Sequence, residues 1–97
     1  MLVAVERFDL RIPGCGSLKE KRHVVKTLAN AIRSTFNVAV AEVDHHDLWQ
    51  RTTLGVAAVA TDGYHVKRVL HEVEKLVERW AEVDIIEMEL TLHDSED

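Results

Sequence analysis

The chain has 97 residues, of which 46% are hydrophobic and 30% are charged, and its formal net charge at pH 7 is −5. This composition is typical of a single folded domain and excludes a disordered or fibrous chain. The negative net charge excludes wholesale electrostatic attraction to nucleic acid or anionic lipid, so any such contact must be local.

The cellular location is indicated by what the sequence lacks. Its longest apolar run, around Val56–Ala60, is far shorter than the ~20 residues that cross a bilayer. The stretch Met1–Arg7 lacks the basic start and long apolar run of a secretion signal. The single cysteine, Cys15, cannot form an intramolecular disulfide, which fits a reducing compartment. We therefore predict a cytoplasmic protein with no membrane partner and no cofactor.

The first part of the chain predicts a strand followed by a helix. Leu2–Ile12 is rich in β-branched and apolar residues, and Pro13–Gly16 then breaks the strand. Ser17 and Glu20 form a capping box, in which the serine hydroxyl accepts a hydrogen bond from the amide three residues on. Apolar residues that predict one buried helical stripe follow at steps of three and four: Leu18, Val24, Val25, Leu28, Ala29, Ile32 and Phe36.

The next part predicts a β-hairpin and a second helix. Val38–Val43 and Arg51–Ala60 are β-prone runs separated by the polar segment Asp44–Trp49, so we expect two strands joined as a hairpin. Thr61–Gly63 offers helix caps, and the amphipathic pattern that follows predicts a helix ending near Ala81.

A final strand over Val83–Leu92 completes the order β-α-β-β-α-β. This order predicts a ferredoxin-like α+β fold, a two-layer sandwich in which two helices cover one face of a four-stranded antiparallel sheet. Residues 1–93 form the single predicted domain, and residues 94–97 form an acidic tail. The alternative is another two-layer α+β packing with a different strand order.

The second face of such a sheet is free to meet solvent, another subunit or a ligand. In the last strand, the residues expected on this open face are Val83, Ile85, Glu87, Glu89 and Thr91. Aromatic residues are few, and the glutamates repel phosphate, so base stacking on the sheet is disfavoured. We therefore expect this face to be solvated or to form a homodimer contact.

Local positive charge predicts an anion or RNA phosphate contact near the first turn. The turn before Ser17 leads into a helix start that carries Lys19, Lys21, Arg22 and Lys26, and free amides at a helix start favour anions. The order of residues lacks a nucleotide-binding fingerprint. The alternative is a tight connection beside a solvated basic face.

The predicted hairpin loop carries the remaining candidate residues. Asp44, His45, His46 and Asp47 have metal-ligand side chains, but adjacent residues rarely converge on one ion, and a polar hairpin tip is the alternative. Trp49, with Arg51, predicts a partner contact, and packing against its own hairpin is equally compatible with the pattern.

Cys15 is the remaining nucleophilic candidate. Its place near a helix start allows a reactive thiolate, but the order of residues identifies no base, so we expect an exposed loop residue.

Four segments together resemble one family of small bacterial proteins, the YlxP-like family, classed as a domain of unknown function. The matching segments are Ile12–Gly14, Ser17–Arg22, Phe36–Asp44 and Asp47–Arg51. The resemblance covers nearly the whole chain. It implies a ferredoxin-like fold and a gene neighbourhood shared with translation and ribosome-maturation factors, and it supplies no catalytic residues.

The leading prediction is therefore a non-enzymatic binding protein associated with RNA or a ribosomal subunit. The alternative is a homo-oligomeric interaction protein that uses the open sheet face. A metal-dependent or hydrolytic enzyme built on Asp44, His45 and Asp47 is the third interpretation.

Overall fold

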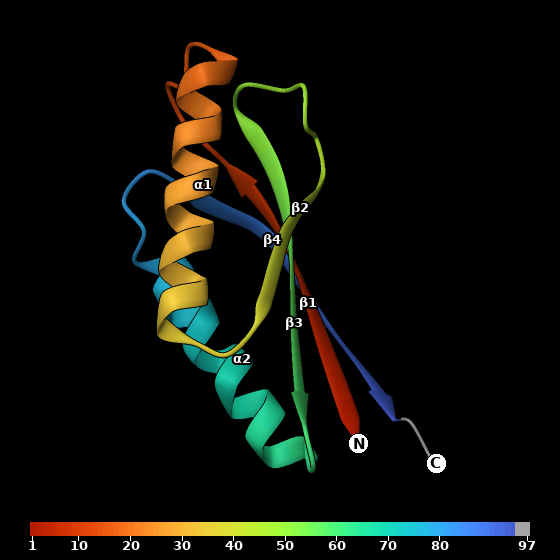
Figure 1. Ribbon diagram of the computed structural model, residues 1–97. Helices are drawn as coiled ribbons and strands as arrows, with labels where there is room; N and C mark the ends of the chain where they lie inside the picture. The colour runs from red at the N-terminus through yellow and green to blue at the C-terminus, as the bar shows by residue number, and fades with distance from the viewer. Residues whose placement is uncertain (95–97) are drawn as a thin grey trace.

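The computed structural model describes residues 1–94. Its six elements are β1 (Leu2–Arg11), α1 (Leu18–Thr35), β2 (Ala39–Asp44), β3 (Arg51–Ala60), α2 (Gly63–Glu78) and β4 (Asp84–Asp94). The strands form one sheet in the order β2-β3-β1-β4, and every neighbouring pair is antiparallel. Both helices lie on one face of the sheet, while the other face is open (Figure 1). The predicted ferredoxin-like α+β sandwich is confirmed.

The element ends show where local hydrogen bonds override the hydrophobic pattern. Helix α2 ends at Glu78, before the predicted limit near Ala81. The Arg79 amide still donates to the Lys75 carbonyl, but the Trp80 amide donates to the Val77 carbonyl three residues back. The last turn therefore tightens, and the Trp80 side chain packs against the core.

The chain end also differs from the prediction. Strand β4 continues through Asp94, which the sequence placed in the acidic tail. Pairing of Asp94 with Leu2 of β1 explains the longer strand. The other tail residues, 95–97, lie outside the described part of the chain.

The turn between β1 and α1 is built by local side chains. The Ser17 hydroxyl accepts from the Glu20 amide at 3.1 Å, as predicted, and the Glu20 carboxylate accepts from the Gly16 amide at 2.9 Å. Gly14 has a φ of 74°, a left-handed conformation that favours glycine. The turn is therefore a defined structure that sets where α1 begins.

The core lies between the helices and the side of the sheet that faces them. Alternate residues of β1 point into it, so Ala4, Phe8 and Leu10 are fully buried. They pack with buried residues of both helices and of β3. Neither helix of the described chain is both long and apolar enough to cross a membrane.

Strand β4 corrects the predicted assignment of residues to the open face. Glu87 and Thr91 lie opposite the open-face residues Asp9 and Val5, as expected. The ladder shifts between Asp9 and Leu10, so that Ile85 lies opposite buried Leu10 and packs against the core. Val83 precedes the strand and is buried. The prediction was therefore wrong for Val83 and Ile85.

Candidate functional site

Lys21 holds the loop between β2 and β3 against α1. Its side chain is 1% exposed. The ammonium group donates to the carbonyl oxygens of His45 and His46, the latter at 3.0 Å, and pairs with the Glu42 carboxylate at 2.9 Å. The Thr52 hydroxyl donates to the same carboxylate at 2.5 Å. One buried cation therefore joins the helix to the last residues of β2 and to the loop.

Further hydrogen bonds fix the two ends of this loop, residues 45–50. The Gln50 side chain donates to the Cys15 carbonyl at 3.2 Å, and the Gln50 carbonyl accepts from the Ile12 amide at 2.9 Å. At the other end, the His46 ring lies 3.2 Å from the Glu42 carbonyl oxygen. The 45–50 loop is thus tied to α1, to the β1–α1 turn and to its own strand.

The 45–50 loop presents two large apolar side chains to solvent. Leu48 is 48% exposed and Trp49 is 52% exposed. Residues Asp47–Arg51 line a shallow hollow beside them. Arg51, the other predicted contact residue, is partly buried at the start of β3. An exposed indole on a loop with fixed ends is a ready contact group for a partner.

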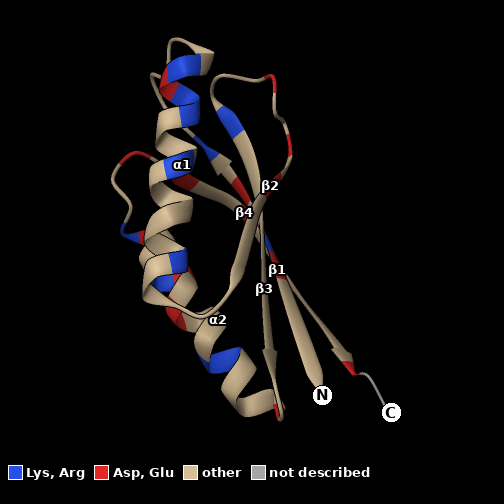
Figure 2. Ribbon diagram, in the orientation of Figure 1, with Lys and Arg blue, Asp and Glu red and all other residues tan. Residues whose placement is uncertain are grey.

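Basic side chains follow one side of α1. Four exposed residues, spaced so that they share one side of the helix, form what we name the basic stripe: Lys19, Arg22, Lys26 and Arg33. Glu20 is the one acidic residue of the helix. Figure 2 shows these basic bands along α1 and the acidic residues that border the β2–β3 loop.

The structure corrects the predicted anion site at Lys21. Lys19, Arg22 and Lys26 are exposed as expected. Lys21 is buried and already paired with Glu42, so it is not available to a phosphate. The prediction was therefore wrong for Lys21, because its position on the helix faces the 45–50 loop and not solvent.

The Asp and His side chains around the loop do not point toward one common position where a metal ion could bind. The His45 ring, through Nδ1, lies 2.9 Å from the Thr53 hydroxyl, which donates to Asp9 at 2.5 Å. The Asp44 carboxylate accepts from the His45 amide at 2.7 Å, and this bond is the main cause that lowers the pKa of Asp44. Asp47 is exposed. Within residues 1–94, no group of three or more His, Cys, Asp or Glu side chains is placed to hold a metal ion.

His45 itself adopts a strained conformation. Its φ is 60°, which non-glycine residues seldom adopt. Lys21 holds its carbonyl, and Thr53 holds its ring. These contacts orient the chain at the point where β2 leads into the loop.

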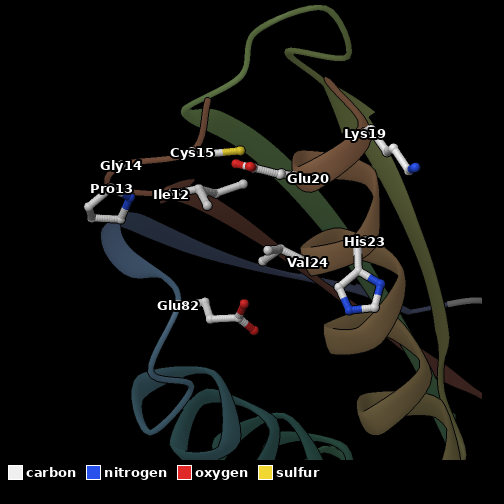
Figure 3. A pocket seen from close by; sticks show the side chains of 9 residues that line it. All are labelled: Ile12, Pro13, Gly14, Cys15, Lys19, Glu20, His23, Val24 and Glu82. Carbon is white, nitrogen blue, oxygen red and sulfur yellow. The ribbon is translucent and has the colours of Figure 1, made fainter. Parts of the chain in front are cut away.

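Cys15 lines a hollow of about 470 Å³ between the β1–α1 turn and the segment that leads into β4. Its side chain is buried, which contradicts the predicted exposed loop residue, and its thiol lies 3.4 Å from the Ser17 carbonyl. Figure 3 shows Glu20 and Glu82 beside the hollow, with Lys19 directed away from it. The turn folds the thiol inward, which the order of residues did not reveal.

The open sheet face combines apolar and charged side chains. Val5 and Val59 are exposed at 36% and 63%. Arg7 lies on the same face, 3.8 Å from Asp9 and 3.6 Å from Asp44. Apolar residues therefore occupy one end of this face, and a charged cluster occupies the other.

Comparison with known proteins assigns the chain to a family. The family described as "Protein of unknown function (DUF503)" matches residues 3–90. The chain belongs to this family. The Bacillus subtilis (strain 168) relative named "Uncharacterized protein YlxP" is 36% identical over 69 residues, which cover 71% of this chain and 75% of the relative. The resemblance to the YlxP-like family is confirmed.

Solved structures share the fold at low sequence identity. The de novo designed protein Foldit4 matches with a TM-score of 0.56 and 12% identity, covering 99% of this chain and 100% of the design. A C-terminal segment of the alpha subunit of aIF2 from Pyrococcus abyssi matches with a TM-score of 0.51 and 18% identity, covering 97% of this chain and 50% of that segment. Identities this low show a shared fold alone.

Sequence reasoning missed the residues that hold the loop. Glu42 lies within a predicted strand and Gln50 lies beside Trp49, and the sequence pattern assigns a role to neither. The hydrophobic period places Lys21 on the buried side of its helix, three residues from Leu18 and from Val24. It does not identify the loop as the partner, because the contacts join residues 24 and 25 positions apart. The exposed Leu48 carries no distinguishing signal in the sequence either.

Proposed function

We propose that this chain is a non-enzymatic RNA-binding protein of the cytoplasm, acting on RNA of the kind handled in ribosome maturation. One observation carries the proposal. Lys21 holds the loop that bears exposed Trp49 against the same helix that carries the basic stripe. We infer from this connection that a stacking group on the loop and a row of basic groups on the helix act together on one RNA.

The basic stripe is suited to following a phosphate backbone. It extends from Lys19 to Arg33, which corresponds to about 21 Å of helix at ~1.5 Å per residue. Basic groups along such a surface attract phosphates and release counterions, and this supplies local affinity even when the whole protein is acidic. The net charge of −5 makes that affinity depend on the stripe and not on the chain as a whole.

Trp49 supplies the second kind of contact. Aromatic side chains stack on unpaired bases with about 1–3 kcal/mol per base, whatever the base. The aromatic residues Phe8, Phe36 and Trp80 instead belong to the core or pack against it. Base stacking is therefore proposed at the loop and not on the sheet.

Charge reversal on the stripe is the test of this function. Arg22→Glu combined with Lys26→Glu is expected to raise the Kd for ribosomal RNA at least tenfold, because two phosphate contacts become repulsive. The log–log salt slope should also fall by about two. Filter binding at about 50 and 200 mM salt measures both quantities.

A matched control separates local contact from overall charge. Lys67→Glu combined with Arg68→Glu makes the same change in net charge on exposed positions of α2. The fold-change in Kd that this control causes should be about ten times smaller than the fold-change caused by the stripe variant. Equal effects of the two double variants, or no binding of RNA by the wild type, would contradict the proposed function.

A second candidate function is a homo-oligomeric interaction protein that uses the open sheet face. The exposed Val5 and Val59 are the observation that favours it. The charged cluster around Arg7 opposes burial of the remainder of that face. Val59→Lys tests this candidate, because it should abolish any assembly that buries the face.

A further inference from the structure

Strand β4 has an apolar side that the helices leave uncovered. Antiparallel partners share a face, so Met88 and Leu92, which lie opposite buried Phe8 and Ala4, are on the helix side of the sheet. Leu90 lies between them on the same side. These three residues, here named the apolar row, are nevertheless exposed at 39%, 41% and 40%. In Figure 1 the C-terminal end of β4 extends away from α2.

The same strand is an unprotected edge of the sheet. It is the outermost strand beside β1 and runs for 11 residues. Edge strands are usually protected by proline, lysine, bulges or short length, because their free backbone groups pair with other strands. From Glu87 to Asp94, β4 has neither proline nor lysine, and its one register shift lies before that stretch. Free backbone groups and exposed apolar side chains thus occur together.

We propose that a second copy of this chain pairs its β4 with this one in antiparallel fashion, about a twofold axis at Leu90. This register places Leu90 opposite its own counterpart and Met88 opposite Leu92 of the second copy. The apolar row of each copy therefore meets the apolar row of the other across the new ladder, the contact that stabilises antiparallel strands.

Charge on the other side of the strand selects this register. With the axis at Leu90, Glu87 lies opposite His93 of the second copy, and Glu89 lies opposite Thr91. An axis at Met88 would instead place Glu87 opposite Glu89, and directly opposed like charges destabilise a strand pair. The register at Leu90 is thus compatible with both faces of the strand.

The alternative on the other side of Leu90 is also less favourable. An axis at Thr91 would place Met88 opposite Asp94 of the second copy, an apolar side chain against a carboxylate. The axis at Leu90 avoids this contact while keeping every member of the apolar row paired.

The proposed dimer leaves the RNA-binding surface free. Strand β4 and strand β2 are the two opposite edges of the sheet, and the 45–50 loop follows β2. Pairing through β4 gives a continuous eight-stranded sheet with all four helices on one face. Each dimer then carries two basic stripes and two exposed Trp49 side chains, so the inference extends the proposed function without depending on it.

Sedimentation equilibrium of the purified chain at low and high micromolar concentration is the first test. The wild type is expected to give the mass of two chains. Leu90→Lys should give a monomer, because it places two ammonium groups opposite each other at the axis. Val59→Lys, the same kind of change on the open face, should remain dimeric. A monomeric wild type, or a dimer lost in Val59→Lys and kept in Leu90→Lys, would overturn the proposal.

Cysteine pairing tests the register without relying on a destabilising variant. Met88→Cys mixed with Leu92→Cys is expected to form a disulfide-linked dimer under mild oxidation, while each variant alone should form far less. The buried native Cys15 is present in every sample, so the wild type serves as its control. Equal cross-linking in the mixture and in the separate variants would contradict the axis at Leu90.

Discussion

Replacing Lys21 by methionine is expected to lower the free energy of unfolding by about 3 kcal/mol, because removal of one member of a buried ion pair leaves its partners without compensation. The Glu42 carboxylate loses its cation, and the carbonyls of His45 and His46 lose a donor. The methionine chain retains the length of the lysine stem, so packing loss is small. Urea denaturation followed by circular dichroism measures the change.

Lys19→Met is the matched control for this prediction. Lys19 is exposed on the same helix, so its replacement should change the stability by less than about 0.5 kcal/mol. Hydrogen exchange adds a structural readout. Amides of the 45–50 loop should exchange faster in Lys21→Met than in the wild type, and at the wild-type rate in Lys19→Met. A loss of stability below 1 kcal/mol with unchanged loop exchange would show that Lys21 does not hold the loop.

The wild type is expected to lose stability as the pH rises from mildly acidic to mildly alkaline. Glu6→Gln is expected to remove this loss. Glu6 is 2% exposed among core residues of β1. Burial first, and then hydrogen bonding and repulsion from Glu74, raise its pKa to about 8. One of its oxygens, Oε1, is buried without a hydrogen-bond partner in the described chain. The folded protein therefore keeps this carboxyl protonated at neutral pH.

The sign of the pH dependence follows from proton linkage. In the unfolded chain Glu6 loses its proton near its ordinary value of 4.5, whereas the folded chain holds it up to about 8. The folded state therefore binds the extra proton in this window, and the free energy of unfolding falls as the pH rises. The slope approaches about 1.4 kcal/mol per pH unit while the unfolded chain has lost this proton and the folded chain still holds it.

Urea denaturation at intervals between pH 5 and 8.5 measures this effect. The neutral amide of Glu6→Gln should flatten the profile and make the variant more stable than the wild type at the alkaline end. Glu78→Gln, at an exposed position of α2, should leave the slope unchanged. A wild-type profile that is level or rises over this range would contradict the assignment.

Much of the fold was predictable because it depends on local patterns. The alternation in β1, the capping box at Ser17 and the run Arg51–Ala60 each define an element from adjacent residues, and the structure places those elements as predicted. The order of elements then admits few topologies. Local sequence rules and the global fold agree over most of this chain.

The errors occur where a distant residue decides the outcome. Lys21 carries a charge but lies three residues from both Leu18 and Val24, on the apolar side of its helix, and the loop beyond β2 completes its burial. Ile85 follows the period of the strand, yet a register shift against β1 moves it to the core side. Cys15 is buried in the core cluster with residues of other elements. Residue spacing alone does not identify the partner of any of these residues, because the partner depends on how separate elements meet.

The central claim, that Trp49 and the basic stripe form one RNA-contact surface, is tested most directly by fluorine NMR of protein labelled with 5-fluorotryptophan. The chain has two tryptophans, the exposed Trp49 and the core-packed Trp80, and Trp49→Phe assigns their resonances. On addition of ribosomal RNA, the Trp49 resonance is predicted to shift or broaden in a salt-dependent manner while that of Trp80 remains in place. A Trp49 resonance that stays unchanged at a saturating concentration of ribosomal RNA would contradict the claim that Trp49 contacts the RNA.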